Sequence, residues 1–168
     1  MKKLSSKQIV MLGLLIATEI ILSRFFAIST PIVKISFAFL PIAIAAICYG
    51  PIWGAMCAGI ADIIGAFLFP VGAFFPGFTL TAALTGAVYG LLLYRNSEKP
   101  WRLIAAVLII CIVLNLGLDT YWLTILLGKS AAVLLPARAI KCLIMIPIQI
   151  LLVRLAQQRI CVRRFVYE

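Results

Sequence analysis

Charged side chains occur at six positions inside or beside long apolar stretches of this chain, and these are the first candidates for chemistry. They are Glu19, Arg24, Asp62, Asp119, Arg138 and Lys141. A charged side chain at the centre of a lipid bilayer costs roughly 2.5–3.5 kcal/mol on insertion scales. If all of them faced lipid, the total cost would be on the order of 10 kcal/mol or more. We therefore expect most of them to face the protein interior or to reach the membrane surface.

The depth of these groups along their helices predicts that several of them meet. If the first helix starts on the cytoplasmic side, Asp62 lies six residues, or ~9 Å, from the outer end of its helix. Asp119 lies eight residues, or ~12 Å, from the outer end of another helix, and Asn115 is one turn deeper. Arg24 ends the first helix on the same side, and Arg138 and Lys141 begin the last one. The sequence thus predicts a polar pocket that opens to the outside.

The residue types around this pocket indicate an anionic ligand with a planar ring. Its basic rim suits carboxylates or phosphates, and comprises Arg24, Lys34, Lys129 and Arg138. Deeper in, a carboxylate can accept two parallel N–H bonds from an amidine-like edge, such as that of a pterin or guanine ring. Nearby aromatic side chains that can stack on such a ring are Phe74, Phe75, Phe78, Tyr121 and Trp122. The alternative is that Asp–Arg pairs only hold helices together.

A short aromatic segment joins two of the apolar helices. It reads Phe69-Pro-Val-Gly-Ala-Phe-Phe-Pro-Gly-Phe-Thr79 and carries no charge. Its two prolines and two glycines prevent a continuous helix. Irregular backbone at membrane depth must cover protein or line a cavity, because lipid cannot satisfy its polar groups. We expect a lid over the ligand site, from Phe74 to Phe78, with contacts to ligand from Phe75, Pro76, Gly77, Phe78 and Thr79.

Composition places the chain in the membrane. Of its 168 residues 65% are hydrophobic and 12% are charged, and the mean hydropathy is +1.19. A soluble domain of this length cannot bury so much apolar surface. The net charge is +10, but the basic residues are scattered at helix ends, which favours membrane topology over nucleic-acid binding. The sequence contains no histidine, so it has no Ser/His or Cys/His set for nucleophilic catalysis, and its phosphate-binding loop motif is incomplete. We therefore predict no enzyme activity and no cofactor or metal.

The lengths and spacing of the apolar stretches predict an all-α integral membrane protein. We expect six transmembrane helices in one bundle, which form a single domain over residues 1–168. The expected helices are 8–27, 35–49, 52–68, 79–94, 101–127 and 136–156, the second bent by Pro41 and the last starting at Pro136. With the N-terminus inside, ten basic residues lie on the cytoplasmic side and five on the outer side. This distribution favours both termini in the cytoplasm.

Small residues recur at four-residue spacing on three of these helices. The sets are Gly13 and Ala17; Gly54, Ala58, Asp62 and Ala66; and Ala82, Gly86 and Gly90. Such faces let helix backbones approach closely in lipid. We expect the second and third sets to pack within the bundle. The first set faces either the bundle or a separate membrane partner.

Several segments together resemble the folate-specific substrate-binding (S) components of energy-coupling-factor (ECF) vitamin transporters, over nearly the whole chain. They are Leu22-Ser-Arg24-Phe25, Lys34-Ile-Ser-Phe37, Ala61-Asp-Ile-Ile-Gly65, the Phe69–Thr79 segment, Asn115-Leu-x-Leu-x-Thr-Tyr-Trp-Leu123 and Pro136-x-Arg138. Two positions differ from the family pattern. Gly13 stands where an Ala-x-x-x-Ala docking motif begins, and Asp119 stands where Asn is expected.

The resemblance implies high-affinity capture of folate or a reduced folate at the outer face of a bacterial plasma membrane. It implies docking through Gly13 and Ala17 of the first helix onto an energising module, a transmembrane scaffold subunit with two ATPases. It places Asp62 and Asn115 on the pterin edge, with Phe75, Phe78 and Trp122 stacking on the ring. Carboxylates of the ligand would meet basic groups, namely Arg24, Lys34 or Arg138.

A second hypothesis is a self-sufficient ion- or proton-coupled carrier for an anionic aromatic metabolite. Glu19, Asp62 and Asp119 would then form a relay. The small size of the chain and the lack of an inverted repeat argue against it.

Overall fold

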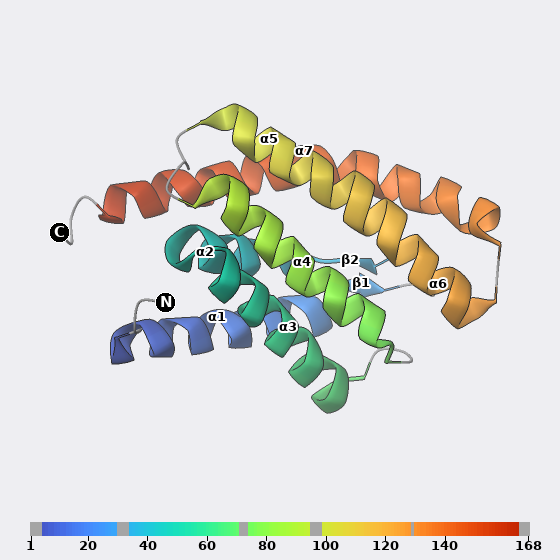
Figure 1. Cartoon of the computed structure of the whole chain (residues 1–168), viewed down its shortest axis with the longest axis horizontal. Coiled ribbons are helices and arrows are strands. Elements are labelled where there is room, and N and C mark those ends of the chain that lie inside the picture. Colours follow the sequence, from blue (N-terminus) through green and yellow to red (C-terminus); the bar gives the residue numbers. More distant parts are fainter. Residues whose placement is uncertain (1–4, 30–33, 71–73, 95–98, 129, 165–168) are drawn as a thin grey trace.

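The computed structural model describes residues 5–29, 34–70, 74–94, 99–128 and 130–164. Nearly all of them are helical. The helices are α1 (Ser6–Arg24), α2 (Phe39–Tyr49), α3 (Pro51–Leu68), α4 (Pro76–Leu93), α5 (Pro100–Leu108), the π-helix η1 (Ile109–Leu118), α6 (Asp119–Leu127) and α7 (Ala131–Arg164). Two short antiparallel strands, β1 (Ile28–Ser29) and β2 (Lys34–Ile35), pair Ile28 with Ile35 and Ser29 with Lys34. Figure 1 shows α5, η1 and α6 as one long rod with α7 beside it, while α1 begins and α7 ends at the same end of the molecule.

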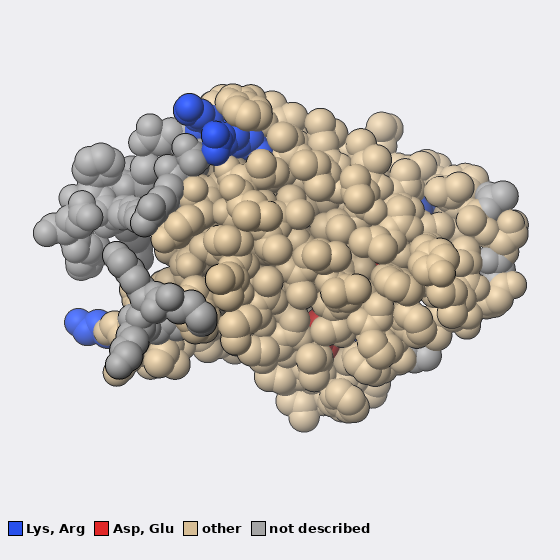
Figure 2. Space-filling model, viewed as in Figure 1, with Lys and Arg blue, Asp and Glu red and all other residues tan. Residues whose placement is uncertain are grey.

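Within the described residues, five helical segments are long and apolar enough to cross a membrane: Ser6–Arg24, Pro51–Leu68, Pro76–Leu93, Pro100–Leu127 and Val133–Gln158. Large apolar side chains point outward from them; for example, Val10 and Phe67 are 72% exposed and Leu143 is 75% exposed. Figure 2 shows a mainly uncharged surface along the molecule, with Lys and Arg gathered toward the end at which α1 and α5 begin. These features are those of a multi-pass membrane protein.

The short helix α2 forms the centre of the packing. With 11 residues it is shorter than each of the five segments that are long enough to cross a membrane, and α1, α3, α4 and α7 all contact it. Its side chains Ala43, Ala45 and Ala46 are completely buried. At ~1.5 Å per residue α2 is only ~16 Å long, about half of a hydrocarbon core. The sixth membrane span therefore stays a prediction.

Glycines bring α3 and α4 into direct backbone contact, which confirms the predicted packing of these two helices. A Cβ atom on Gly86 would collide with the backbone of Gly54, and one on Gly90 would collide with the backbone of Pro51. A Cβ on Gly54 would lie 2.7 Å from Cβ of Ala46 in α2. Only hydrogen fits at these three positions, so α2, α3 and α4 pack as closely as their backbones permit.

The segment before α2 is not helical, contrary to the sequence prediction. Lys34 and Ile35 lie in β2, and the helix begins at Phe39 instead of residue 35. Pro41 is consequently the third residue of α2, where its missing N–H removes no helical hydrogen bond. Proline at this position does not bend a helix, so the basis of the predicted bend at Pro41 is absent. The first predicted turn of the helix is replaced by the end of β2 and the residues that join β2 to α2.

The predicted lid is shorter than expected because α4 begins at Pro76. Three helices of this protein, α3, α4 and α5, have proline as their first residue, where the fixed φ angle suits the helix and the N–H is not needed. Pro76, Gly77, Phe78 and Thr79 are therefore helical and not part of a loop. Of the remaining loop, residues 71–73 lie outside the described part of the chain.

Proline does not mark the start of the last helix. α7 begins at Ala131 and continues to Arg164, beyond both predicted ends, with Pro136 and Pro147 inside it. α1, in turn, ends at Arg24 and not at residue 27. The long predicted helix over 101–127 was right in extent, but its middle ten residues form η1, which the sequence did not indicate.

Candidate functional site

One polar group joins α1, α3 and α4. The Arg24 guanidinium lies 3.5 Å from Oδ1 of Asp62, and its Nη2 also donates to the Asp62 carbonyl at 3.4 Å. The Thr79 hydroxyl donates to Oδ2 of Asp62 at 2.7 Å. Asp62 thus has a partner for each carboxylate oxygen, one from the end of α1 and one from the first turn of α4.

Arg24 fits this position because α3 has no side chain where the guanidinium passes. A Cβ atom on Gly65 would lie 2.8 Å from Nε of Arg24. Gly65 is one helical turn beyond Asp62, so the same face of α3 supplies both the carboxylate and the space beside it. Nε of Arg24 is buried and has no hydrogen-bond partner among the described residues.

A second polar group joins η1, α6 and α7. Nη2 of Arg138 lies 3.3 Å from Oδ2 of Asp119 and donates to the carbonyl of Asn115 at 2.8 Å. The two side chains are only 5% and 17% exposed, respectively, so this ion pair is shielded from solvent. The π-helix contributes directly, since the Asn115 carbonyl that Arg138 binds lies within it.

Aromatic side chains from the start of α4 and from α6 meet nearby in the fold. The ring centroids of Phe75 and Trp122 are 5.5 Å apart, and those of Phe75 and Phe78 are 6.1 Å apart. Gly77 lies beneath them, where a Cβ would come within 2.7 Å of both Phe75 and Trp122. Nε1 of Trp122 is buried without a hydrogen-bond partner in the described part of the chain, which leaves a donor available to a ligand.

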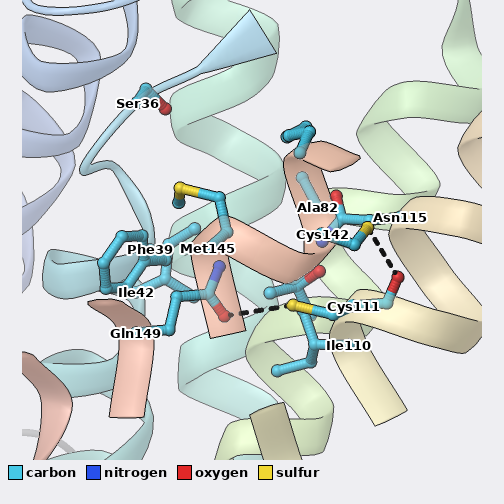
Figure 3. Close-up of a pocket in the computed structure, with 12 residues that line it drawn as sticks. Ser36, Phe39, Ile42, Ala82, Ile110, Cys111, Asn115, Cys142, Met145 and Gln149 are labelled. Carbon is cyan, nitrogen blue, oxygen red and sulfur yellow. Dashed lines mark hydrogen bonds between the residues drawn. The ribbon is translucent and has the colours of Figure 1, made fainter. Parts of the chain in front are cut away.

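A cavity of about 140 Å³ lies between α2, α4, η1 and α7. It is lined by Ser36, Phe39, Ile42, Ala82, Thr85, Ile110, Cys111, Asn115, Lys141, Cys142, Met145 and Gln149. Figure 3 shows Gln149 and Met145 on one wall and Asn115 with Cys142 on another. Gln149 is held in place because the Tyr89 hydroxyl donates to its Oε1 at 3.3 Å and the Cys111 thiol does so at 3.7 Å. The mixed lining of apolar walls and a few fixed polar groups is typical of a small-molecule site.

The predicted site residues fall into these groups. Arg24, Asp62 and Thr79 form the first ion-pair group; Arg138 and Asp119 form the second; and Phe75, Gly77, Phe78 and Trp122 form the aromatic group. Pro76 is exposed at the start of α4, and Asn115 lines the cavity. For Lys34 the structure describes only the backbone, and Lys129 lies outside the described residues. The predicted ligand role of each residue stays a proposal.

Two residues of this cavity, Met145 and Gln149, are absent from the sequence prediction, which includes Lys141 only as a charged group at the depth of the pocket, without a ligand role. Lys141, Met145 and Gln149 all line the cavity from α7. A usable signal was present, since positions 138, 141, 145 and 149 follow the three- and four-residue spacing of one helix face and three of them are polar.

Gly13 and Ala17 lie on the outer face of α1. Both are exposed, and a Cβ atom on Gly13 would meet nothing within 4 Å. The opposite face of α1 carries the buried residues Leu12, Leu15 and Glu19. The predicted small-residue face is thus accessible from outside the bundle, and not covered by other described helices.

Comparison with known proteins identifies the class of this molecule. Residues 7–156 match the model of the family described as "ECF transporter, substrate-specific component". The match covers most of the chain, so this protein belongs to the family of substrate-specific (S) components of ECF transporters.

Within that family, the similar proteins are folate transporters. The chain is 38% identical over 142 residues to the folate transporter FolT of Clostridium novyi, with 84% of this chain and 83% of FolT covered. It is 36% identical over 154 residues to FolT of Leuconostoc mesenteroides, with 88% and 83% covered. A crystal structure of FolT bound with folic acid superimposes with a TM-score of 0.88 at 36% identity, over 92% of this chain and 95% of that one. These relatives are transport proteins, which agrees with the prediction that the chain is not an enzyme.

Proposed function

We propose that this chain captures folate at the outer face of a bacterial plasma membrane and delivers it inward as the S component of an ECF transporter. The observation that carries the proposal is the likeness, over nearly the whole chain, to a FolT structure that holds folic acid. The proposal includes six membrane spans, both termini in the cytoplasm and a pocket open to the outside.

The polar and aromatic groups support the chemistry of this ligand. Folate has a pterin ring with an amidine-like edge, a benzoyl ring and two glutamate carboxylates. Asp62 and Asn115 are proposed to bind the pterin edge, since carboxylate and amide groups match its donors and acceptors. The rings of Phe75, Phe78 and Trp122 are proposed to pack on the planar ring, where each contact adds roughly 0.5–1.5 kcal/mol beyond burial.

The basic residues are proposed to bind the two carboxylates. Arg24, Lys34 and Arg138 are the candidates, because guanidinium and ammonium groups form charge-assisted hydrogen bonds with carboxylates. The arginine side chains are already oriented by Asp62 and Asp119, which lowers the conformational entropy lost when a ligand binds.

Energy for transport is proposed to come from a partner, an energising module of a transmembrane scaffold subunit and two ATPases. The exposed Gly13 and Ala17 of α1 are the proposed docking face, because small residues allow a partner helix to approach closely. Membership of the S-component family supports this partnership.

The direct test is a calorimetric titration of the purified protein in detergent with folate, and then with biotin, riboflavin and thiamine. We expect tight one-to-one binding of folate and none of the others. Absence of folate binding would contradict the proposal. Uptake by the chain alone in liposomes under a proton gradient would instead support the carrier hypothesis.

The Gly65→Ala variant tests the Arg24 assignment without removing any polar group. The added methyl group would lie 2.8 Å from Nε of Arg24, so the guanidinium has to shift from its present position beside Asp62. Because the end of an arginine side chain is flexible, we expect the free energy of unfolding to change by less than about 1 kcal/mol. We expect the affinity for folate to fall by about tenfold, the effect of one charge-assisted hydrogen bond.

The matched control is Gly59→Ala on the same helix, where the added Cβ would meet only Ala83 at 3.7 Å. This variant should bind folate like the wild type. If Gly65→Ala also keeps the wild-type affinity, Arg24 does not contact the ligand.

A further inference from the structure

The start of α5 carries cationic and aromatic side chains that the proposed function does not use. Lys99 and Trp101 are exposed, and the Arg102 guanidinium lies over the Trp101 ring, with 5.4 Å between its Cζ and the ring centroid. Nε of Arg102 is buried and has no hydrogen-bond partner among the described residues. Arg102 therefore keeps a donor for an acceptor from outside the described chain.

A second buried donor lies on α7, which packs against α5. Gln157 is only 6% exposed, and its Nε2 also has no hydrogen-bond partner in the described part of the chain. Leu103, which follows Arg102, and Val153, one turn before Gln157, belong to the same buried core. The two donors thus lie at one edge of this core, on neighbouring helices, where a single acceptor group can satisfy both.

The end of the molecule at which α1 and α5 begin and α7 ends is strongly positive. Its segments hold ten basic residues in the sequence and two acidic ones, Glu98 and Glu168. The described carboxylates, those of Glu19, Asp62 and Asp119, lie in the second halves of helical segments that begin at this end. Figure 2 shows the Lys and Arg side chains gathered there. This end therefore attracts anions, and anionic phospholipids are the anions that surround a membrane protein at highest density.

An exposed apolar face of α5 continues from the donors along the bundle. Trp101, Ile104 and Leu108 are all exposed and follow the three- and four-residue spacing of one helix face. Tryptophan is enriched at the level of the lipid headgroups, where its ring is apolar and its N–H stays close to water. A soluble anion could use the donors but not this face, whereas a phospholipid can use both.

We propose that the start of α5 and the adjoining part of α7 form a binding site for an anionic phospholipid. Lys99, Arg102 and Gln157 hold the phosphate of the headgroup, and an acyl chain lies along Trp101 and Ile104. The site goes beyond the proposed function, since it holds a membrane lipid and not the vitamin. It also differs from general attraction to a positive surface, because one half-buried arginine provides both a charge and an unused donor.

The test measures the midpoint of thermal unfolding of the full-length protein in a neutral detergent. The added probes are dioleoylphosphatidylglycerol, dioleoylphosphatidylcholine with the same tails and no net charge, and glycerol 3-phosphate with no tails. Arg102→Gln removes the charge of the proposed site. The matched control Lys7→Gln removes one positive charge from an exposed residue of α1 at the same end.

We expect phosphatidylglycerol to raise the wild-type midpoint by about 2–4 °C more than phosphatidylcholine does, because a ligand that binds only the folded state stabilises it. Glycerol 3-phosphate should leave the midpoint unchanged. Arg102→Gln should lose most of the difference between the two lipids, and Lys7→Gln should keep it. Gln157→Leu, which changes no charge, should also reduce the difference. Midpoints without lipid verify that each variant is folded.

Three results would overturn the inference. Equal losses in Arg102→Gln and Lys7→Gln would show general attraction to a positive surface. Equal stabilisation by the two lipids would exclude recognition of the anionic headgroup. A shift with glycerol 3-phosphate as large as that with phosphatidylglycerol would indicate a site for a soluble anion. None of these results bears on folate binding, which is measured by the separate titration.

Discussion

Replacing Arg138 with methionine is expected to lower the free energy of unfolding by about 3–5 kcal/mol, because it leaves the Asp119 carboxylate buried without its partner. The two side chains are 5% and 17% exposed, so water cannot replace the guanidinium. The substitution also removes the donor at 2.8 Å from the Asn115 carbonyl, a group of the π-helix. The ion pair thus connects α7 to α6, and the hydrogen bond connects α7 to η1.

Unfolding is measured in detergent, without ligand, by heating or by denaturant. The control is Arg154→Met on the same helix, whose side chain is exposed and which should change stability by less than about 1 kcal/mol. The double variant Asp119→Leu with Arg138→Met should recover most of the loss, since neither charge is then unpaired. If Arg138→Met is as stable as Arg154→Met, the ion pair does not stabilise the bundle.

Replacing Gly86 with alanine is expected to destabilise the protein by about 1–3 kcal/mol or more, because the new methyl group has no space. The atoms that it would meet are the carbonyl of Gly54 and the backbone nitrogen of Ala55, both on α3. Backbone atoms cannot rotate away as a side chain can, so α3 and α4 have to separate. This separation also disturbs α2, since Gly54 packs on Ala46.

The matched control is again Gly59→Ala, which adds the same methyl group to the same helix pair at an ordinary contact distance of 3.7 Å from Ala83. Because alanine is the better helix former, this variant should be as stable as the wild type or more stable by about 0.5–1 kcal/mol. Thermal unfolding of the two variants side by side measures the difference. Equal midpoints for Gly86→Ala and Gly59→Ala would contradict close packing of α3 and α4.

Helix starts show where a local rule succeeds and where it fails. Proline is favoured as the first residue of a helix, and Pro51, Pro76 and Pro100 have this role in the structure. Pro136 was predicted to have this role, whereas Pro76 was predicted to be part of a lid. Whether a given proline begins a helix depends on whether the preceding residues can also be helical. For Pro136 they are, since α7 begins five residues earlier at Ala131.

The candidate site could be predicted in part, because depth along a helix follows from counting residues. Asp62 and Arg24, and likewise Asp119 and Arg138, were placed at similar depths and meet in the structure. The rotation of each helix about its own axis, which decides where each face points, could not be predicted by counting residues. The π-helix changes the number of residues per turn between Ile109 and Leu118, and with it the face that Asn115 presents.

The sequence by itself determined that this is a membrane protein of apolar helices, because the free energy of moving a side chain from water into lipid depends mainly on its own chemistry. It also determined that the charged side chains have to avoid lipid. Only the tertiary structure decided which charges pair, because several Asp–Arg and Asp–Lys combinations are compatible with the same depths. Among the described residues, Asp62 pairs with Arg24 and Asp119 with Arg138, and Lys141 is the cation that lines the cavity.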